Sequence, residues 1–492
     1  MNEIIIKQHN AVHYKVIAES GILREIQEVF SFYAPNYKHA PLYKMGKWDG
    51  IIKLFSLKDR LLYCGLLDEL FEFCKNKNYH LDLSDLPLNS TNASDSAIDD
   101  FIKSLNVFEL RDYQITAIKE TIRHNNLFLL SPTNSGKTIC SYVICRYYDH
   151  LKKLYIVPDT GLLNQTEQKF IEYGYDPEQI HTIFSGKEKQ TDHKITISTW
   201  QSLMNMPEEY FKQWDLIIGD EAHKFQANKL KYIMENSVNA KHRIGMTGSL
   251  DGSVVNELTL RGLFGPIVKT TTTKELIDNN FATPLKINCI MLKYPKNDRD
   301  YFSPKFKRKY SDEVDFIINH DKRTDFIIDS IFNMKGNSLV LTKFIDKSLK
   351  PLYDKIKKRL EEQEDPRKIF LVYGNVKGEE RIEIAKQISN ENHSITIASS
   401  QTFSTGIDIP NIDNLFLISA TKAPIPLLQS LGRILRIADN KKIAKVFDFY
   451  DDCSYVTRTG KKKKSYSLLH FIERLKIYSS EKHPYKIIEI DL

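Results

Sequence analysis

The sequence has no apolar run long enough to cross a membrane, and its first apolar stretch, Ile4–Ile6, is too short for a secretory signal peptide. Cysteine is scarce: six occur in 492 residues, and no two form a C-x-x-C pair. Most lie inside apolar runs, which indicates buried free thiols in a reducing compartment and argues against disulfides or a zinc site. We therefore expect a soluble cytoplasmic protein with no membrane contact.

The composition excludes two further classes of protein. Hydrophobic residues make up 41% and charged residues 27%, as in ordinary globular proteins, so most of the chain is not disordered. A chain of 492 residues is also too long for one core and should divide into about three units. The formal net charge of +7 permits a polyanionic partner without establishing one.

The pattern of apolar runs and helical stretches along the chain predicts an α/β fold with two tandem parallel-sheet domains. Residues 1–83 mix short strand-like and helical patterns, as in a small α+β accessory domain, and the polar residues 84–100 resemble a linker. Over 101–280, short apolar β-branched runs alternate with helical stretches, and the same alternation returns over 281–455. The basic and helical residues 456–492 are predicted to form a C-terminal extension.

The stretch SPTNSGKT has the spacing of a phosphate-binding loop between a strand and a helix. In such a loop, backbone N–H groups surround the β-phosphate, lysine meets the β- and γ-phosphate oxygens, and threonine ligates Mg²⁺. A serine stands where the first glycine is usual, but that position mainly needs a small residue. The predicted nucleotide contacts are Ser131, Pro132, Thr133, Asn134, Ser135, Gly136, Lys137 and Thr138.

A second motif, which is acidic, supports a nucleotide site. The apolar run DLIIGDEAH ends in adjacent carboxylates, Asp220 and Glu221. A strand end that carries such a pair can offer Asp220 to Mg²⁺ and Glu221 to the attacking water during ATP hydrolysis. An exposed acidic turn is the alternative, but it explains poorly why the pair follows an apolar strand downstream of a phosphate loop. We predict a functional ATP and Mg²⁺ site.

Six motifs in order resemble those of the superfamily 2 helicases over residues 108–450: RDYQ, the phosphate loop, DEAH, TGS, STGIDIP and QSLGRILR. The resemblance implies two RecA-like domains with the nucleotide between them. It implies that Gln114 reads the adenine edge and that Gly406 and Asp408 contact or sense the nucleotide. It further implies that the TGS motif couples the ATP site to the nucleic-acid site. It also implies that Arg433 and Arg436 stabilise charge on the transferred phosphoryl group.

The segment QSLGRILR has helical spacing, with Gln429, Arg433 and Arg436 at i, i+4 and i+7. This spacing predicts that one helix face presents all three to the nucleotide. A solvated basic helix face is the alternative, and it leaves Gln429 and Gly432 unexplained.

Four short segments with hydroxyl side chains follow predicted strands: VPDTGLL, STWQS, LTKF and SQTFSTG. Such segments contact nucleic-acid phosphates without reading sequence, although ordinary turns between strands and helices favour the same residues. The resemblance places all four along the family's nucleic-acid track. The predicted contacts are Pro158, Thr160, Ser198, Thr199, Thr342, Lys343, Ser404 and Thr405.

Within the superfamily, the chain resembles the UvsW-type phage DNA helicases. The similarity lies in YKMGKWDGIIKLF, TGSL, the segment 263–288 and VFDFYDD. It implies an N-terminal domain that contacts duplex DNA, with Trp48, Lys44 and Lys47 as candidates; a packed indole in a turn is the alternative for Trp48. Two basic stretches with aromatics, within 296–310 and 458–466, are further candidates for DNA contact or are solvated loops.

These observations predict an ATP-dependent DNA helicase that acts, as a monomer, on single-stranded and branched DNA. Forks, four-way junctions and R-loops, with their RNA, follow from the resemblance, as does a host cytoplasm if a phage encodes the chain. A translocase on duplex DNA without strand separation and an RNA helicase remain alternatives, because a requirement for the 2′-hydroxyl leaves no mark on the sequence. A scaffold that has lost turnover is a third, against which the intact Lys137, Glu221, Arg433 and Arg436 argue.

Overall fold

The structure is a computed structural model of residues 1–492. It describes all of them except 1–2, 87–92, 107–108, 185–187, 190, 225–226, 251, 301–308, 375–377, 405–408, 410, 420–423, 439–440 and 457–458. The chain forms two compact units, Met1–Thr271 and Thr272–Leu492. Each unit contains one seven-stranded sheet, and every strand pair in both of these sheets is parallel.

The first unit begins with a small domain built on the five-stranded sheet β5-β6-β2-β1-β7. Inward residues of β1 alternate with outward ones, so Ile4 and Ile6 are fully buried, and α1 buries Ile22 and Ile26 against the same core. A separate hairpin pairs β3 with β4. The elements are β1 Glu3–Gln8, β2 His13–Ile17, α1 Ser20–Val29, β3 Ser31–Tyr33, η1 Tyr37–His39, α2 Pro41–Lys44, β4 Ile51–Lys53, β5 Phe55–Ser56, β6 Leu61–Tyr63, η2 Cys64–Leu66, α3 Leu67–Lys77 and β7 His80–Asp82.

The rest of the first unit is an α/β domain with strand order β10-β11-β9-β12-β13-β8-β14. Its central strands are buried along their whole length, as expected for a sheet with helices on both faces. Its elements are α4 Asp95–Ser104, α5 Asp112–His124, β8 Asn126–Leu130, α6 Lys137–Tyr147, β9 Lys153–Val157, α7 Thr160–Glu172, η3 Pro177–Gln179, β10 Ile180–Ile183, β11 Ile195–Thr199, α8 Trp200–Leu203, α9 Glu208–Phe211, β12 Leu216–Asp220, η4 Ala222–Lys224, α10 Ala227–Asn236, β13 His242–Thr247, α11 Val254–Phe264 and β14 Ile267–Lys269.

The N-terminal domain shares a hydrophobic core with this α/β domain. The hydroxyl of Tyr63 donates to Glu235 at 2.6 Å, and Arg261 pairs with Glu69 at 2.7 Å. The backbones also approach closely: a Cβ added at Gly65 would lie 1.9 Å from the carbonyl oxygen of Arg261. The two domains therefore form one continuous packed body.

The predicted linker is shorter than expected. Helix α4 begins at Asp95, inside the range 84–100, because Ser94 caps it by accepting from the N–H of Ala97 at 3.2 Å. Ile98 on this helix is fully buried in the core of the α/β domain. The polar composition of the segment concealed Ile98, which is fully buried, and Leu86 and Ala93, which are partly buried against hydrophobic cores.

The second unit is an α/β domain with strand order β17-β18-β16-β19-β20-β15-β23. Its elements are α12 Thr273–Asp278, β15 Leu285–Lys293, α13 Lys296–Asp300, α14 Tyr310–Ile318, α15 Asp321–Phe332, β16 Asn337–Thr342, the π-helical turn η6 Ile345–Leu349, α16 Lys350–Glu362, β17 Lys368–Val372, α17 Gly378–Ser389, β18 Ser394–Ser399, α18 Ser400–Ser404, β19 Ile412–Leu417, α19 Pro424–Ile434, β20 Ala444–Asp452, β21 Tyr455–Val456, β22 Lys462–Lys463, α20 Tyr466–Ser480 and β23 Tyr485–Asp491.

The end of the chain is part of this second domain. Strand β23 pairs in parallel with β15, and on α20 the side chain of Arg474 forms a buried ion pair with Asp448 of β20 at 2.8 Å. Residues 456–492 were predicted to be an extension because their exposed strand, YKIIEID, has little of the apolar texture of the inner strands. The side chains of this edge strand are mostly exposed, so the strand does not need the apolar run of a buried inner strand.

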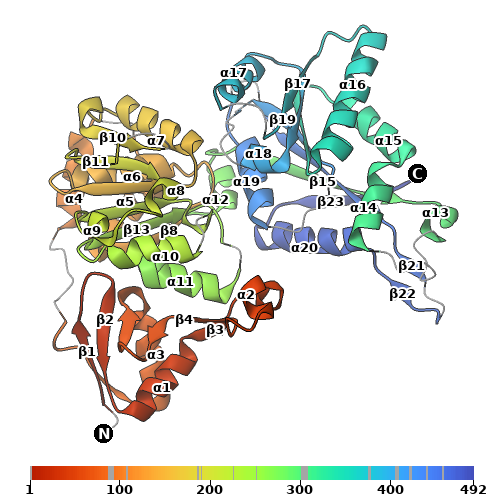
Figure 1. The fold of residues 1–492 in the computed structure, drawn as a ribbon. Coiled ribbons are helices and arrows are strands. Elements are labelled where there is room, and N and C mark those ends of the chain that lie inside the picture. Colours follow the sequence, from red (N-terminus) through yellow and green to blue (C-terminus); the bar gives the residue numbers. More distant parts are fainter. Residues whose placement is uncertain are drawn as a thin grey trace. The chain divides into compact units, whose positions relative to one another are not determined.

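The architecture confirms the predicted fold class: two RecA-like parallel sheets and a small N-terminal sheet domain (Figure 1). All six cysteines are free, as predicted, and five of them are buried. No helix in the part of the chain that the structure describes is long and apolar enough to span a membrane.

Candidate functional site

The nucleotide-site residues of the first unit gather at one edge of its sheet. In the order β12-β13-β8, the three strands end at Asp220, Thr247 and Leu130, and carboxyl ends of parallel strands share one edge. The N–H of Ser131, just after β8, donates to the carbonyl oxygen of Thr247 at 2.8 Å. The phosphate loop, the acidic pair and the TGS motif, far apart in sequence, are therefore brought together.

The phosphate loop has the backbone shape that wraps a phosphate group. Gly136 has φ +84° and Asn134 has φ +70°, and α6 begins at the next residue, Lys137. Both are left-handed conformations, which glycine and asparagine tolerate best. A Cβ at Gly136 would lie 2.2 Å from Nε2 of Gln114, so the position requires glycine for space as well as for φ.

Ser131 occupies the place of the usual first glycine without placing its side chain in the loop's interior. Its side chain is buried, and Oγ lies 2.7 Å from the Thr270 hydroxyl. Its carbonyl oxygen accepts from Nζ of Lys137 at 3.2 Å. The hydroxyl therefore points into the protein, away from the loop's phosphate-binding face.

Lys137 and Glu221 lie next to each other at the centre of the site. Nζ of Lys137 is 3.5 Å from Oε1 of Glu221. Glu221 itself has φ +48°, which is uncommon for a side chain of this size. Such strained positions concentrate at functional sites, where the surrounding structure holds them.

The other carboxylate oxygen of Glu221 faces the TGS motif. Oε2 lies 3.1 Å from the hydroxyl of Thr247 and 3.4 Å from the N–H of Gly248. His223 Nδ1 is 3.4 Å from the same oxygen and also contacts the Thr247 hydroxyl. The DEAH and TGS motifs therefore form one hydrogen-bonded cluster.

Asp220 is buried at the end of β12. It accepts from the N–H of Glu221 at 2.9 Å and from the hydroxyl of Tyr155 at 3.4 Å. Burial, together with the neighbouring Glu221 charge, raises the pKa of Asp220 to about 6, while Lys137 opposes that rise. A divalent cation would favour the ionised form of this carboxyl group.

These residues fit ATP and Mg²⁺. The hydroxyl of Ser135 in the loop is buried and has no hydrogen-bond partner among the described residues, as expected of a group that a ligand completes. Thr138 and Asp220 supply one hydroxyl and one carboxylate, and Mg²⁺ usually takes few protein ligands, with phosphate and water oxygens filling the rest. No group of three or more His, Cys, Asp or Glu side chains suited to a metal occurs in the described part of the chain.

The side chain of Gln114 is held by the protein itself. Oε1 accepts from the N–H of Arg111 at 2.9 Å, and Nε2 donates to the carbonyl oxygen of Ser135 at 2.8 Å. The hydroxyl of Tyr113 donates to that same carbonyl at 2.9 Å. The predicted adenine reader thus also supports the phosphate loop.

In the second unit, the predicted arginine face differs from expectation. Helix α19 ends at Ile434, so only Gln429 and Arg433 lie on it, and Arg436 comes two residues later. A tighter bond, from the N–H of Arg436 to the carbonyl of Arg433 at 3.3 Å, takes the chain past the helix end. Burial lowers the pKa of Arg436, to about 10, so its guanidinium stays charged at neutral pH.

Three of the predicted nucleic-acid contacts point inward. The hydroxyl of Ser198 donates to the carbonyl of Ile183 at 3.2 Å. The hydroxyl of Thr199 lies 2.9 Å from that of Ser202, and the hydroxyl of Thr342 lies 2.9 Å from that of Ser419. All three are buried, so their hydroxyl groups satisfy the protein and are not offered to a phosphate. For these side chains the observed bonds are those that the turn-chemistry alternative predicts.

The remaining predicted contacts divide into exposed residues and those outside the described part. Thr160, the first residue of α7, and Lys343, just after β16, are exposed, whereas Pro158 is buried and its carbonyl accepts from Gln201 at 2.9 Å. Thr405, Gly406 and Asp408 lie outside the described residues, and Ser404 is described only in its backbone, at the end of α18.

Trp48 is not an open platform for DNA. Its indole N–H donates to the carbonyl of Ile51 at 3.1 Å, and the ring is half-buried. Gly50 follows with φ +80°, and a Cβ there would lie 2.4 Å from the Tyr37 ring. The turn alternative therefore describes Trp48.

Around the predicted candidates Lys44 and Lys47, the connection from β3 to β4, which includes α2, carries exposed apolar and aromatic side chains that the sequence analysis did not single out (Figure 1). Tyr33, Leu42 and Met45 are 61%, 54% and 59% exposed. The rings of Tyr33, Tyr37 and Tyr43 stack or meet edge to face at 4.6 and 4.9 Å. We call this the β3–β4 patch, and it comprises Tyr33, Tyr37, Lys38, Leu42, Tyr43, Lys44, Met45 and Lys47.

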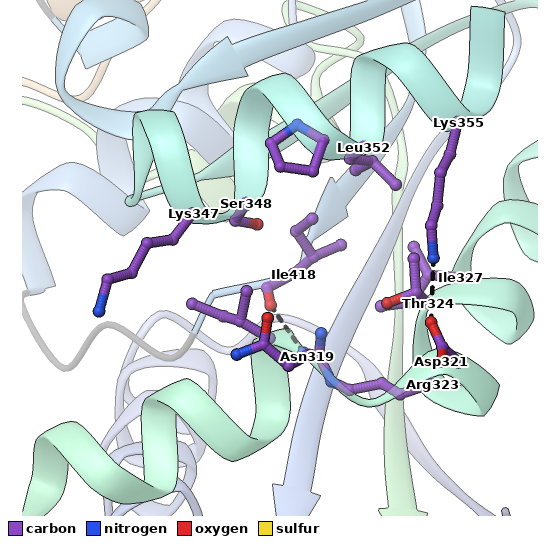
Figure 2. A pocket seen from close by; sticks show the side chains of 12 residues that line it. Asn319, Asp321, Arg323, Thr324, Ile327, Lys347, Ser348, Leu352, Lys355 and Ile418 are labelled. Atoms are coloured by element: carbon purple, nitrogen blue, oxygen red, sulfur yellow. Dashed lines mark hydrogen bonds and ion pairs between the residues drawn. The ribbon is translucent and has the colours of Figure 1, made fainter. Parts of the chain in front are cut away.

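The second unit also holds a polar cavity of about 190 Å³ between α15, η6 and α16 (Figure 2). Its positive charges are already paired: Lys347 with Asp315 at 2.7 Å, and Lys355 with Asp321 at 3.1 Å. We assign no ligand to it.

Comparison with known proteins agrees with this geometry. Residues 3–84 match the family model "DNA helicase UvsW, N-terminal", residues 107–251 match "Type III restriction enzyme, res subunit", and residues 322–438 match "Helicase conserved C-terminal domain". The chain is 30% identical over its whole length to the whole of the ATP-dependent DNA helicase uvsW of Enterobacteria phage T4. It is 24% identical to the DNA 3'-5' translocase XPB2 of Sulfurisphaera tokodaii, covering 68% of this chain and 80% of that one.

Solved structures extend the comparison. The crystal structure of T4 UvsW matches with a TM-score of 0.52 and 28% identity, over 99% of both chains. Mss116p bound to ssRNA and AMP-PNP matches with a TM-score of 0.53 at 13% identity, over 82% of this chain and 81% of that one, which shows the shared fold alone. Through its full-length similarity to the phage T4 helicase, the chain belongs to the UvsW family of DNA helicases.

Proposed function

We propose that this chain uses ATP hydrolysis, with Mg²⁺, to unwind or branch-migrate branched DNA such as forks, four-way junctions and R-loops. Family membership supports an ATP-dependent DNA helicase. The observation that carries the catalytic part is the cluster of Lys137, Glu221 and Thr247, in which the lysine and the hydroxyl contact opposite oxygens of one carboxylate.

Each residue of this cluster has a physical task in the proposal. The loop N–H groups and Lys137 hold the phosphate oxygens, and Thr138 and Asp220 hold Mg²⁺, which neutralises phosphate charge when bound. Glu221 orients the attacking water or accepts its proton, since its oxygens lie between Lys137 and Thr247. Arg433 and Arg436 supply guanidinium charge to the phosphoryl group as it transfers.

The domain boundaries form part of the proposal. We assign residues 1–83 to the accessory domain, 101–271 to the ATP-binding domain and 272–455 to the second RecA-like domain, so the boundary predicted at 280/281 moves to Thr271/Thr272, where the two compact units divide. The fold adds α4, from Asp95, to the ATP-binding domain and residues 466–491 to the second.

The β3–β4 patch is the surface that we assign to DNA in the accessory domain. Its exposed aromatic and apolar side chains can stack on unpaired bases, and Lys38, Lys44 and Lys47 can neutralise backbone phosphates. A branch point presents both unpaired bases and duplex backbone. We therefore assign the junction to this patch, in place of Trp48 alone.

ATP hydrolysis by the purified protein tests this function, measured with no polymer, single-stranded DNA, forked DNA, a four-way junction and RNA, beside Glu221→Gln. We expect the strongest stimulation with branched DNA and none in the variant. Stimulation by RNA alone would replace the DNA assignment with an RNA helicase. An unbranched duplex is added as a further polymer: if it stimulates hydrolysis as strongly as branched DNA does, a duplex translocase is favoured.

A further inference from the structure

The backbone just after α19 is held by residues that no motif includes. Thr283 donates twice: its N–H to the carbonyl of Leu435 at 2.8 Å, and its hydroxyl to the carbonyl of Arg436 at 2.9 Å. Thr283 precedes β15 and lies 153 positions before Arg436 in the sequence. Two segments that are remote in sequence are therefore hydrogen-bonded to each other at Arg436, the proposed phosphoryl-contacting arginine.

Lys441 shares the carbonyl of Arg436 with Thr283 and also reaches a neighbouring carbonyl. Its ammonium group donates to the carbonyl of Arg436 at 3.2 Å and also contacts the carbonyl of Ile434. The side chain is only 9% exposed, and the backbone N–H of Lys441 donates to the carbonyl of Ala438 at 3.0 Å. Three consecutive carbonyls, from Ile434 to Arg436, thus accept from Thr283 or Lys441.

These bonds account for the early end of α19. The last carbonyls of a helix have no intrahelical partners and need other donors. Here three donors, the N–H and hydroxyl of Thr283 and the ammonium group of Lys441, converge on the stretch that carries Arg436. The carbonyl of Arg436 itself accepts two of the bonds, so the backbone atoms from which its side chain extends are fixed.

We propose that Thr283 and Lys441 are positioning residues for ATP hydrolysis: they hold the backbone of Arg436 so that its guanidinium meets the transferred phosphoryl group. This inference rests on the proposed role of Arg436. Its physical basis is that charge stabilisation depends steeply on placement, because a small displacement from the productive geometry loses much of the rate.

The charge on Lys441 makes its hydrogen bonds to the carbonyls of Ile434 and Arg436 depend on pH. Burial lowers the pKa of Lys441 to about 8; Asp413 of β19 opposes this, and the Arg436 guanidinium adds to it. Lys445 of β20 faces the same Asp413, whose carboxylate accepts from the N–H of Asn337 at 2.8 Å. The ammonium is therefore present below pH 8 and is lost as the pH rises through that value, which leaves weaker neutral donors.

The test compares Lys441→Met, Lys441→Arg, Thr283→Val and Arg436→Ala in DNA-stimulated ATP hydrolysis by the full-length protein. We expect Lys441→Met to lower kcat about tenfold, with KM for ATP changed by less than about twofold. The reason is that ATP binding does not need the Arg436 guanidinium in its productive place. Thr283→Val keeps the backbone bond and loses only the hydroxyl, so we expect a smaller loss of kcat. Lys441→Arg should restore most of the rate.

The pH profile separates positioning from simple helix capping. The rate of the wild-type protein should fall above pH 8 while that of Lys441→Arg stays level, because arginine remains charged in that range. Thermal unfolding of each variant checks folding, and Thr283→Val carries the test if Lys441→Met does not fold. An unchanged kcat in both Lys441→Met and Thr283→Val would overturn the inference, as would a fall above pH 8 that Lys441→Arg shares.

Arg436→Ala distinguishes failure of this inference from failure of the proposed function. If Arg436→Ala lowers kcat and the Lys441→Met and Thr283→Val variants do not, only the positioning role is wrong. If Arg436→Ala keeps full kcat, the role of Arg436 and the inference built on it are both wrong.

Discussion

The hydroxyl of Thr247 lies 3.1 Å from the carboxylate of Glu221, so the TGS motif touches the residue that we assign to the attacking water. The backbone of Thr247 also meets the phosphate loop, since its carbonyl accepts from the N–H of Ser131 at 2.8 Å. One residue at the end of β13 therefore contacts both the phosphate-binding and the water-orienting parts of the site. A shift of β13 would disturb both together.

We predict that Thr247→Val lowers kcat for ATP hydrolysis while leaving ATP binding nearly intact. Valine keeps the shape of threonine but removes the hydroxyl, which leaves Glu221 less firmly oriented; the loss should be about tenfold, as for other general base contacts. Steady-state hydrolysis and binding of a fluorescent ATP analogue measure the two effects. Thr247→Ser, which keeps the hydroxyl, is the matched control. Equal rates in the valine and serine variants would show that the contact does not act in catalysis.

Gly136→Ala should abolish ATP binding. The new Cβ would lie 2.2 Å from Nε2 of Gln114, and alanine disfavours the φ of +84° found here. The loop would have to change shape, and its N–H groups would no longer converge on a phosphate. Nucleotide titration by calorimetry measures the loss. Gly252→Ala is a suitable control, because Gly252 also has positive φ, +75°, but open space around it; a similar loss of binding there would contradict the argument.

Asp220→Asn should raise the Mg²⁺ concentration needed for half-maximal hydrolysis by about tenfold or more, because a neutral amide is a poorer ligand for a hard cation. Folding should survive, since the side chain accepts from Tyr155 and the N–H of Glu221 in a way that an amide oxygen can partly replace. A Mg²⁺ titration of ATP hydrolysis makes the measurement. An unchanged requirement for Mg²⁺ would remove Asp220 from the metal site.

Replacing Tyr43, Lys44 and Lys47 together by alanine should weaken binding to forked DNA while leaving hydrolysis without DNA unchanged. The expected loss in affinity is about tenfold or more, with a weaker dependence on salt, because both stacking and phosphate contacts are removed. Fluorescence anisotropy at several salt concentrations measures it. Phe71→Ala on α3, which removes another exposed aromatic side chain (51% exposed) of the same domain, is the control. Equal affinities for the patch and control variants would move the junction contact elsewhere.

The convergence of the proposed nucleotide-site residues in the first unit could be predicted from the sequence because its signals are local. An apolar strand followed by SPTNSGKT or by DEAH specifies both the residue types and their place at a strand end, and parallel strands bring those ends to one edge. The alternating strands and helices of both domains were readable for the same reason. The inner strands β8, β9, β11, β12 and β13 all appear where apolar runs predicted them.

The direction of a hydroxyl group could not be read in the same way. Ser198, Thr199 and Thr342 sit at strand ends in the expected order, yet each is buried and bonded within the protein. A sequence pattern fixes the position of such a residue but not which neighbour its hydroxyl will find, since turn chemistry and phosphate contact select the same residues.

Contacts between remote segments were equally hidden. Nothing near Thr283 or Lys441 in the sequence indicates that their side chains meet the carbonyl of Arg436, and the ion pair between Arg261 and Glu69 spans 192 positions. The last strand was missed because a half-exposed edge strand lacks an apolar run. These features depend on the packing of the whole domain.

Strand separation tests the central claim most directly. The purified protein is mixed with a labelled DNA fork and a four-way junction, with ATP and Mg²⁺, and released strands are followed in time beside Glu221→Gln. We predict ATP-dependent conversion of both substrates by the wild-type protein and none by the variant, with DNA binding retained in both. Hydrolysis that is stimulated by DNA but separates or migrates no strands would contradict the helicase account.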